Sequence, residues 1–417
     1  MCKLTNRKSN DFKVLSFNVE GLNSELDNPN FVDLLYKHDI CLLNETWRGV
    51  DTKINLPGLW DFSLIRPKKK KFGRCSEGIT IFCKEDIRSG IKVVQSEEGF
   101  VWLKLDDKIF GLKNPLFICA TYIPPEYSTR KSGVNIDYYK NLTNSLANFS
   151  SKGNVLIAGD MNARLGAQLN KIHDLSCIDE LVPDNTNYDI GERSSCDNIT
   201  NIYGRKLDKI CKSFNLSIAN GRTLGDRLGN FTCYNNKGAS VVDYVISDQS
   251  FFKNIKSLQV LPPEFRSIHT PISCILNMSI NKSKPYKDKL LESPPKFKWD
   301  PVAREPLRDL LIRESHNLRE LEEYLNRDVI QITEIEQVAK TFTEIVFDKS
   351  SKCLKMIRKI KKTNNKKNSK NKPWYTLECD SLRKRLLRIT RLLVKNPKDP
   401  YIRGKFFQVR KDYRKND

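Results

Sequence analysis

Short apolar runs alternate with amphipathic stretches over the first 280 residues of the chain. Continuous apolar runs rich in β-branched residues predict buried strands at 14–17, 40–43, 78–83, 101–105, 116–122, 154–158 and 272–276. Apolar residues at helical spacing predict helices at 30–36, 136–149 and 205–214. The stretches 231–234 and 241–246 are expected to pair across a turn at 235–238. Many strands with few interleaved helices favour packed sheets with helices outside, of the α/β or α+β class.

The pattern changes after residue 280. The segment 281–295 is polar and rich in Pro and Lys, which predicts a linker, and 301–349 has helical periodicity with mixed charge. The segment 359–372 is basic and of low complexity, so we expect it to be disordered. The stretches 377–394 and 401–413 are predicted to form basic amphipathic helices. The chain is therefore expected to combine one large sheet-based domain with a helical C-terminal part.

Charge separates these two parts. Residues 351–417 contain 23 basic and 5 acidic residues, whereas residues 1–280 contain 36 basic and 31 acidic residues. A near-neutral globular part followed by a basic tail indicates an anionic polymer as partner, most often nucleic acid. The open alternative is a solvated basic helix that has no partner.

Other features of the composition narrow the class of protein. The sequence contains no apolar run of about 18 residues, so no membrane span is expected. The first residues lack the apolar core of a signal peptide, which favours an intracellular protein whose 12 cysteines are reduced. With only four histidines, none of them at ligand spacing to two cysteines, a zinc site is not expected.

Polar side chains recur where the predicted strands end. If these ends meet at one edge of a sheet, their carboxylates and amides form a cluster with a single histidine. Such a cluster suits an oxygen-ligated cation such as Mg²⁺ better than zinc, and it suits phosphoryl chemistry. Each residue alone is equally compatible with an ordinary turn. The residues are Asn18, Glu45, Tyr122, Asp160, Asn162, Asp243 and His269.

The sequence motifs around these positions are more specific than the single residues. In chain order it reads Leu-Ser-Phe-Asn-Val-Glu-Gly-Leu at 15–22, Leu-Asn-Glu-Thr-Trp at 43–47, Ala-Thr-Tyr-Ile-Pro-Pro at 120–125, Ala-Gly-Asp-Met-Asn-Ala-Arg at 158–164, Val-Asp-Tyr-Val at 242–245 and Ile-His-Thr-Pro-Ile at 268–272. Over residues 12–277 this resembles the endonuclease/exonuclease/phosphatase superfamily, which includes DNase I and the apurinic-site endonucleases. Within it, Asn-Gly-Arg-Thr-Leu-Gly-Asp at 220–226 and Phe-Thr at 231–232 are most similar to the endonuclease domains of non-LTR (LINE-type) retrotransposons.

The resemblance implies a fold and a set of roles. The fold is a four-layer, DNase I-like sandwich of two sheets flanked by helices. Glu45 would be the principal ligand of Mg²⁺, for which Mn²⁺ can substitute, with Asn18 and Glu20 nearby. Asp160 would orient or deprotonate the attacking water, and Asn162 would position it. The remaining roles are a phosphate donor at Tyr122, a phosphate-binding or acid–base histidine at His269, and an aspartate at Asp243 that holds this histidine.

Further residues are assigned to DNA binding. The hairpin that begins with Phe231 and Thr232 would touch DNA, together with Arg164 and with Arg385 in the tail. Lys69 in the four-lysine run either meets phosphates at the rim of the cleft or lies in a solvated loop. The tail is similar to the segment that joins such endonucleases to a reverse transcriptase, and no polymerase motif is present in this chain. We therefore divide the chain into a nuclease domain at 12–277, a linker at 278–300, a helical connector at 301–350 and a basic extension at 351–417. Deleting the extension is expected to weaken DNA binding and leave hydrolysis intact.

The implied function is Mg²⁺-dependent nicking of one DNA strand in the nucleus. The 3′-hydroxyl would prime reverse transcription, with the element's own RNA as a further partner. One departure from the family motif weakens the prediction of an active nuclease, because Ile268 stands where the family usually has Asp before the histidine. The loss of one carboxylate could cost several kcal/mol in the transition state. The alternatives are a catalytically impaired nucleic-acid-binding remnant and an apurinic-site repair endonuclease of the same fold.

Overall fold

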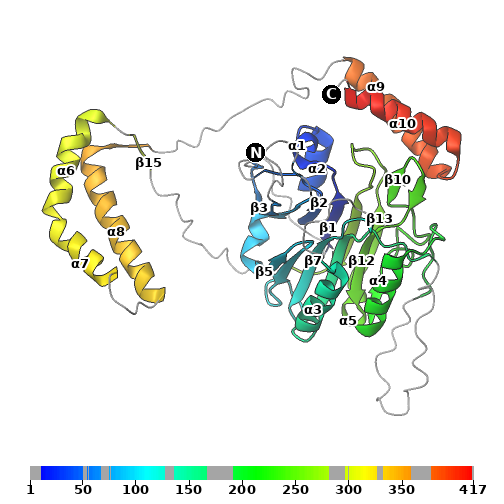
Figure 1. The fold of residues 1–417 in the computed structure, drawn as a ribbon, viewed down its shortest axis with the longest axis horizontal. Helices are drawn as coiled ribbons and strands as arrows, with labels where there is room; N and C mark the ends of the chain where they lie inside the picture. The colour runs from blue at the N-terminus through cyan, green and yellow to red at the C-terminus, as the bar shows by residue number, and fades with distance from the viewer. Residues whose placement is uncertain are drawn as a thin grey trace, which may run out of the picture. The chain divides into compact units, whose positions relative to one another are not determined.

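The computed structural model describes residues 11–49, 54, 56–66, 75, 77–126, 136–166, 191–280, 296–298, 300–325, 332–357 and 377–415. The chain forms two units, one made of residues 1–284 with 371–417 and one made of residues 285–370 (Figure 1). The first unit contains all of the residues that are predicted from the sequence to be catalytic.

Two six-stranded mixed sheets form the first unit. The first sheet has the strand order β13-β14-β1-β2-β4-β3 and the second has the order β5-β6-β7-β8-β12-β9. The strands of the first sheet are β1 (Asp11–Asn18), β2 (Ile40–Asn44), β3 (Leu59–Leu64), β4 (Ile79–Lys84), β13 (Ile255–Val260) and β14 (Ile272–Asn277). The strands of the second sheet are β5 (Ile91–Glu97), β6 (Phe100–Leu105), β7 (Leu116–Tyr122), β8 (Asn154–Asp160), β9 (Leu216–Ile218) and β12 (Asp243–Asp248).

The apolar side chains divide into three layers, because successive residues of a strand point to opposite faces. In β1, Val14 belongs to the core between the two sheets, whereas Leu15 and Phe17 belong to the core between the first sheet and its helices. In β8, Leu156 lies between the sheets, whereas Ile157 belongs to the core under the helices of the second sheet. The continuous apolar runs thus reflect strands that are buried on both faces, and the four-layer sandwich is confirmed.

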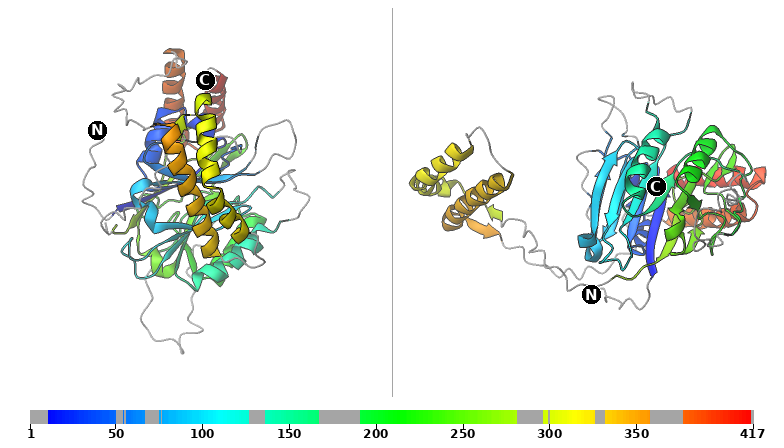
Figure 2. Two further views of the ribbon diagram at one scale, coloured as in Figure 1. Left: turned by 90° about the vertical axis from the view of Figure 1, so that its left-hand side faces the viewer. Right: turned by 90° about the horizontal axis from the view of Figure 1, so that it is seen from below.

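Helices cover the outer faces of both sheets (Figures 1 and 2). On the first sheet, Phe31 and Leu35 of one helix contact Phe17. On the second sheet, Leu142 and Leu207 are buried with the outward side chains of its strands. The helices are α1 (Leu22–Glu25), α2 (Pro29–Tyr36), α3 (Tyr138–Ser150), α4 (Ile202–Ser213) and α5 (Gln249–Phe252), with a 3₁₀ turn, η1 (Glu85–Gly90).

The expected hairpin at 231–246 is only partly correct. The hairpin consists of β10 (Cys233–Asn235) and β11 (Gly238–Ser240), which join through the predicted turn. The following residues do not pair with 231–234. Instead β12 runs antiparallel to β8 in the second sheet, with Asp243 opposite Asp160. The chain therefore leaves the hairpin after three residues and carries Asp243 back to the sheet edge.

The last two helices, α9 (Leu377–Lys395) and α10 (Pro400–Lys415), belong to the same unit as the sheets. Their apolar side chains are buried in the core cluster of the second sheet and its helices. These side chains are Leu386, Leu393, Phe406, Val409 and Tyr413. The α9–α10 hairpin is thus packed against the nuclease domain (Figure 1).

The second unit is a small helical module. It contains β15 (Lys296–Lys298), η2 (Pro301–Ala303), α6 (Arg304–Arg313), α7 (Ser315–Leu325), α8 (Ile332–Cys353) and β16 (Lys355–Ile357). The short strands pair antiparallel, and Phe297 lies 5.5 Å from Phe347 between ring centroids. The helical periodicity at 301–349 is therefore confirmed. The predicted linker at 281–295 and the disorder predicted at 359–372 lie outside the described residues.

Two further predictions can be compared with the described part of the chain. The cysteines described there are all free, as expected for reduced thiols, and most are buried. Among the described helices none has the length and apolar character that crossing a membrane requires.

Candidate active site

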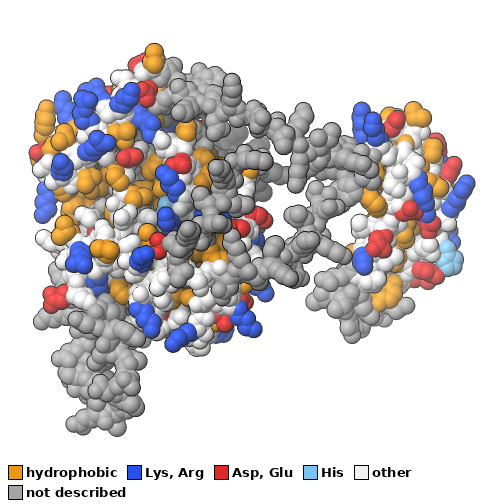
Figure 3. Space-filling view, turned by 180° about the vertical axis from the view of Figure 1, so that it is seen from behind, with side chains coloured by type: hydrophobic (Ala, Val, Ile, Leu, Met, Phe, Trp, Pro, Cys, Tyr) orange, Lys and Arg blue, Asp and Glu red, His pale blue; other side chains and the backbone are white. Residues whose placement is uncertain are grey.

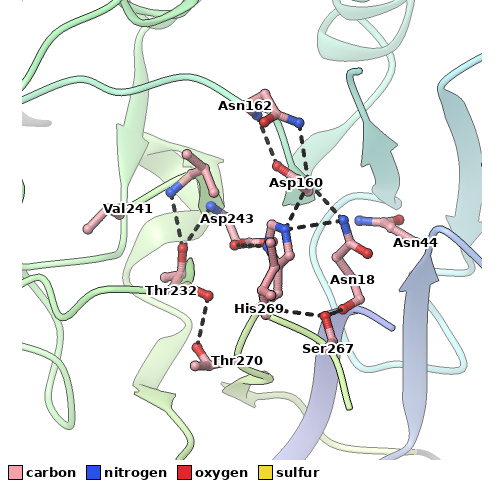
Figure 4. A network of polar contacts seen from close by, with 12 residues as sticks. Asn18, Asn44, Asp160, Asn162, Thr232, Val241, Asp243, Ser267, His269 and Thr270 are labelled. Atoms are coloured by element: carbon pink, nitrogen blue, oxygen red, sulfur yellow. Dashed lines mark hydrogen bonds and ion pairs between the residues drawn. The ribbon is translucent and has the colours of Figure 1, made fainter. Parts of the chain in front are cut away.

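The polar strand ends meet at one edge of the two sheets. Strands β1 and β2 are parallel with Asn18 beside Asn44, and β7 and β8 are parallel with Tyr122 beside Asp160. Because parallel strands end at the same edge, each sheet presents two polar residues there. The antiparallel β12 adds Asp243 at its first residue. The topology therefore brings together residues that are far apart in the sequence (Figure 4).

Asn18 connects the two sheets. Its buried amide nitrogen donates to Glu45 Oε1 at 3.0 Å and to Asp160 Oδ2 at 2.9 Å. Its Oδ1 accepts the backbone N–H of Glu20 at 3.3 Å. An amide with its nitrogen between two carboxylates orients them both. In this geometry Asn18 acts on the site through hydrogen bonds with those carboxylates.

His269 lies between two buried aspartates. Its Nδ1 is 2.8 Å from Asp243 Oδ2, and its Nε2 is 3.7 Å from Asp160 Oδ2. Asp243 is fixed from behind by Thr232, whose Oγ1 accepts the backbone N–H groups of Val242 and Asp243, each at 3.1 Å. The imidazole is therefore held in one orientation by a carboxylate that is itself held in place.

Burial and charge shift the protonation of this cluster. Burial alone would lower the pKa of His269, but the negative charge of Asp243, aided by Cys233 and Asp160, raises it well above the usual value. Burial raises the pKa of Asp160 to about 7, against the opposing effect of the nearby His269. The Nε2 atom also lies 3.5 Å from the Asn18 nitrogen, which is too long for a strong hydrogen bond. The neighbouring carboxylates therefore favour the protonated form of the His269 ring.

Three residues at this edge adopt left-handed backbone conformations without being glycine. Glu20 has φ 46°, Glu45 has φ 49° and Asn162 has φ 47°. Such conformations are unfavourable for residues with side chains and persist where surrounding contacts enforce them. Each of them follows the end of a strand and turns its side chain at the site. For Asn162, the backbone N–H donates to Asp160 Oδ1 at 3.0 Å and the side-chain nitrogen donates to the Ile123 carbonyl at 2.8 Å.

The donor set fits a hard divalent cation. Glu45 is partly exposed, and one of its oxygens is oriented by Asn18, so its carboxylate faces the site as an oxygen ligand. A second candidate cluster is Asp160, Asp243 and His269, whose ligand atoms lie within 4.8 Å of one another. A metal-bound histidine must be neutral, so a cation in that cluster would have to displace the proton that the aspartates favour on His269. Glu45, the ligand predicted from the sequence, offers carboxylate oxygens without that change at His269.

The residues predicted to bind DNA occupy different environments. Thr232 is fully buried and its hydroxyl accepts two backbone N–H groups, so it supports Asp243 and is not exposed to a ligand. Arg164 forms a bidentate pair with Asp197, through Nε at 2.8 Å and Nη2 at 2.6 Å. Arg385 is exposed on α9, and Lys69 lies outside the described residues. Tyr122 is buried and lines a small cavity of about 170 Å³ with Arg66.

Several supporting residues are not among those predicted from the sequence to form the site. Asn44 donates to the Thr121 carbonyl at 2.9 Å and joins the two sheets beside Asn18. Ser267 donates to the Asn18 carbonyl at 2.6 Å and accepts the His269 backbone N–H at 3.0 Å. The Thr232 carbonyl accepts the Thr270 N–H at 2.8 Å and the Thr270 hydroxyl at 3.3 Å, the second of which is drawn in Figure 4. These contacts join segments that are distant in the chain, and only Asn44, the residue before Glu45, lies at a recognisable strand end.

The fold and a match to a family model together define the class of this protein. Residues 15–273 match the model of the Endonuclease/Exonuclease/phosphatase family, and the chain belongs to that family. The fold is similar to solved structures that include the AP endonuclease LMAP from Leishmania major (14% identity, TM-score 0.47, covering 64% of this chain and 87% of that one). It is also similar to the endonuclease domain of TRAS1, a telomere-specific non-LTR retrotransposon (12% identity, TM-score 0.42, covering 64% of this chain and 98% of that one). A further similar structure is the APE2 catalytic domain of Xenopus laevis (15% identity, TM-score 0.45, covering 66% of this chain and 95% of that one). A comparison with curated proteins found no match.

Proposed function

We propose that residues 12–277 form an endonuclease that hydrolyses one phosphodiester bond of DNA and leaves a 3′-hydroxyl end. The observation that carries the proposal is the placement of His269, whose Nδ1 lies 2.8 Å from Asp243 Oδ2 and whose Nε2 lies 3.7 Å from a second buried carboxylate, Asp160. The transition state of phosphoryl transfer carries negative charge on its non-bridging oxygens. A fixed cation beside a poised carboxylate is the arrangement that this reaction needs.

The two aspartates differ in their task. Asp243 accepts from Nδ1 and holds the ring, so that Nε2 is the atom available to a phosphate oxygen. The raised pKa of Asp160 places this carboxylate near neutrality, where a general base is most effective. Asn162, on the turn after β8, is bonded to Asp160 and is the group best placed to orient the water that Asp160 deprotonates.

A divalent metal fits the proposal through Glu45. Mg²⁺ held there, with Glu20 as an outer carboxylate, would supply positive charge and Lewis acidity to the scissile phosphate. The chain's own contribution is to fix Glu45 through Asn18, so that the ligand and the base Asp160 are oriented by the same amide.

The surroundings of the site suit a nucleic acid. Lys and Arg side chains gather over the α9–α10 hairpin, and they include exposed Lys384, Arg385, Arg388 and Arg391 (Figure 3). Phosphates are held by such charges in a salt-dependent manner. We propose DNA as the substrate, with the 3′-hydroxyl serving as primer for a retrotransposon's reverse transcriptase acting in the nucleus, and with the element's RNA as a second ligand of the basic helices.

A plasmid-nicking assay tests the proposal. Supercoiled plasmid is incubated with the full chain and Mg²⁺, beside the Glu45→Ala, His269→Ala and Ile268→Asp variants. We expect relaxed circles with the unmodified protein and a strong loss with both alanine variants. Nicking that survives both alanine substitutions would refute the site.

The same assay separates the two alternatives. Nicking by Ile268→Asp alone would identify a catalytically impaired remnant that retains the fold. A strong preference for an oligonucleotide with an abasic site over intact DNA would identify a repair endonuclease.

A further inference from the structure

Two loops of the active site depend on one another. One follows β1 and carries Glu20; the other precedes β14 and carries Arg266, Ile268 and His269. The Ile268 backbone N–H donates to Glu20 Oε2 at 2.8 Å, while the Arg266 N–H donates to Glu25 Oε1 at 2.7 Å. The backbone that presents His269 is therefore fixed by side chains of the first loop.

A residue from the far end of the chain reaches both loops. Arg410 on α10 is 3% exposed. Its Nη2 donates to the Arg266 carbonyl and lies 3.8 Å from Glu20 Oε2. Buried arginines need paired acceptors, and here both acceptors belong to the loops that carry Glu20 and His269. This contact joins α10 to the active site across about 390 residues of sequence.

The packing of α10 makes the contact specific. Phe406 and Val409 are buried in the cluster shared with the second sheet, and they flank Arg410 on the inner face of the helix. On α9, Thr390 is buried beside the Pro263 carbonyl, at 3.5 Å, just before the same loop. The guanidinium is thus brought to its partners by a docked helix, with little freedom to point elsewhere.

We propose that Arg410 is a positioning residue for the nuclease, and that the α9–α10 hairpin is part of the catalytic unit. This inference rests on the proposed function. The planar guanidinium holds the Glu20 carboxylate and the Arg266 carbonyl together, and thereby fixes the backbone of Ile268 and His269. A carboxylate is absent at position 268, but Glu20 brings one to the backbone of that residue, and Arg410 keeps it there.

The test compares Arg410→Gln and Arg410→Lys with a matched control, Lys405→Gln, which removes one charge from an exposed position of the same helix. Each full-length protein is assayed for kcat and KM on a nicking substrate, and for amide hydrogen exchange in the segment 264–269. We expect Arg410→Gln to lower kcat by about 10- to 100-fold with little change in KM, since small displacements of reacting groups are costly. Arg410→Lys retains the charge, and its kcat is expected to lie between those of Arg410→Gln and the unmodified protein.

A double-variant cycle separates positioning from a loss of folding. If Arg410 acts through Glu20, combining Arg410→Gln with Glu20→Gln costs little more than the worse single change. Hydrogen exchange at the Arg266 and Ile268 amides is expected to accelerate in Arg410→Gln and to stay unchanged in Lys405→Gln.

Two results would overturn the inference: kcat of Arg410→Gln equal to that of the control, or unchanged exchange at 264–269. If the unmodified protein does not nick DNA, the proposed function fails, whereas exchange still decides whether Arg410 orders the loop.

Discussion

The contact between Asp243 and His269 gives the sharpest test of the mechanism. Asp243→Asn keeps the size of the side chain but removes the charge that raises the pKa of His269. The 2.8 Å bond to Nδ1 is replaced by a weaker contact with an amide. A hydrogen bond to a charged group contributes about 1.5–3 kcal/mol. If this is lost in the transition state, kcat falls by about 10- to 150-fold.

The pH dependence gives a second, independent signature. Activity that needs the Asp160 carboxylate rises as pH increases through about 7. Activity that needs the His269 cation persists until the pH passes the raised pKa of this residue and then falls. Without Asp243, the largest influence that raises this pKa is removed, while burial still lowers it. The alkaline limb of the kcat profile is therefore expected to move to lower pH in Asp243→Asn.

The matched control lies at the other end of the same strand. Asp248 ends β12 and caps α5 by accepting the Phe251 N–H at 2.9 Å. Asp248→Asn removes an equal charge and keeps the N-cap through one oxygen, but it loses the bond that the other oxygen accepts from the Val155 N–H at 2.6 Å, so stability should fall while kcat of the folded protein should not change. Asp243→Asn is compared with this control in kcat and in the pH at which activity falls on the alkaline side. If both quantities are the same in the two variants, Asp243 does not set the charge of His269, and the proposed role of the imidazolium is refuted.

Four further predictions concern the metal, the support of the site and the DNA surface. Glu45→Gln should abolish Mg²⁺-dependent nicking while leaving the thermal unfolding midpoint nearly unchanged, because its carboxylate is partly exposed. Thr232→Val leaves two buried backbone donors unpaired and should lower the free energy of unfolding in urea by about 1–3 kcal/mol for each. The groove of about 330 Å³ beside β10–β11 is lined by Lys398 and Arg403, so reversing both charges should weaken DNA binding and reduce the slope of log K against log[salt] by about 1 per lost phosphate contact. Deleting 371–417 exposes the apolar residues that α9–α10 buries, at about 1.5–3 kcal/mol per side chain, and should reduce both stability and nicking.

Each of these outcomes has a clear contrary result. Metal-dependent nicking by Glu45→Gln would remove this residue as the ligand, and wild-type stability of Thr232→Val would show that water replaces its hydroxyl. Unchanged salt dependence in the reversed-charge variant would exclude the groove from the DNA path. Full activity after deletion would restore the expectation drawn from the sequence, in which the basic extension only binds nucleic acid.

The sequence predicts the strands that are buried on both faces, because a continuous apolar run leaves little ambiguity. It misses β3, β5 and β13, in which at most two residues are buried and the others are exposed or half-exposed. It also misses β9, which has only three residues. These strands lie at or next to the edges of their sheets, where one face is exposed and the apolar signal is diluted.

The error at 231–246 has a different cause. Periodicity predicts that two apolar stretches around a turn continue to pair, and nothing local marks the point where they separate. In the structure, Thr232 accepts from Val242 and Asp243 with its side chain, which ends the ladder and redirects the chain into the second sheet. The same hydroxyl that interrupts the hairpin thus holds the catalytic aspartate, and a threonine in an apolar run carries no signal of either role.

The significance of Ile268 also depends on long-range contacts. Taken alone, the motif has an apolar side chain before His269 where the family usually has Asp, which predicts one carboxylate fewer in the site. In the folded chain, the Ile268 backbone N–H is bonded to the carboxylate of Glu20, and Arg410 lies against that carboxylate from α10. The number of carboxylates near this loop is therefore set by three segments together, of which the motif is only one. A nicking activity that falls when Glu20 or Arg410 is replaced would show that these two residues compensate for the missing carboxylate at position 268.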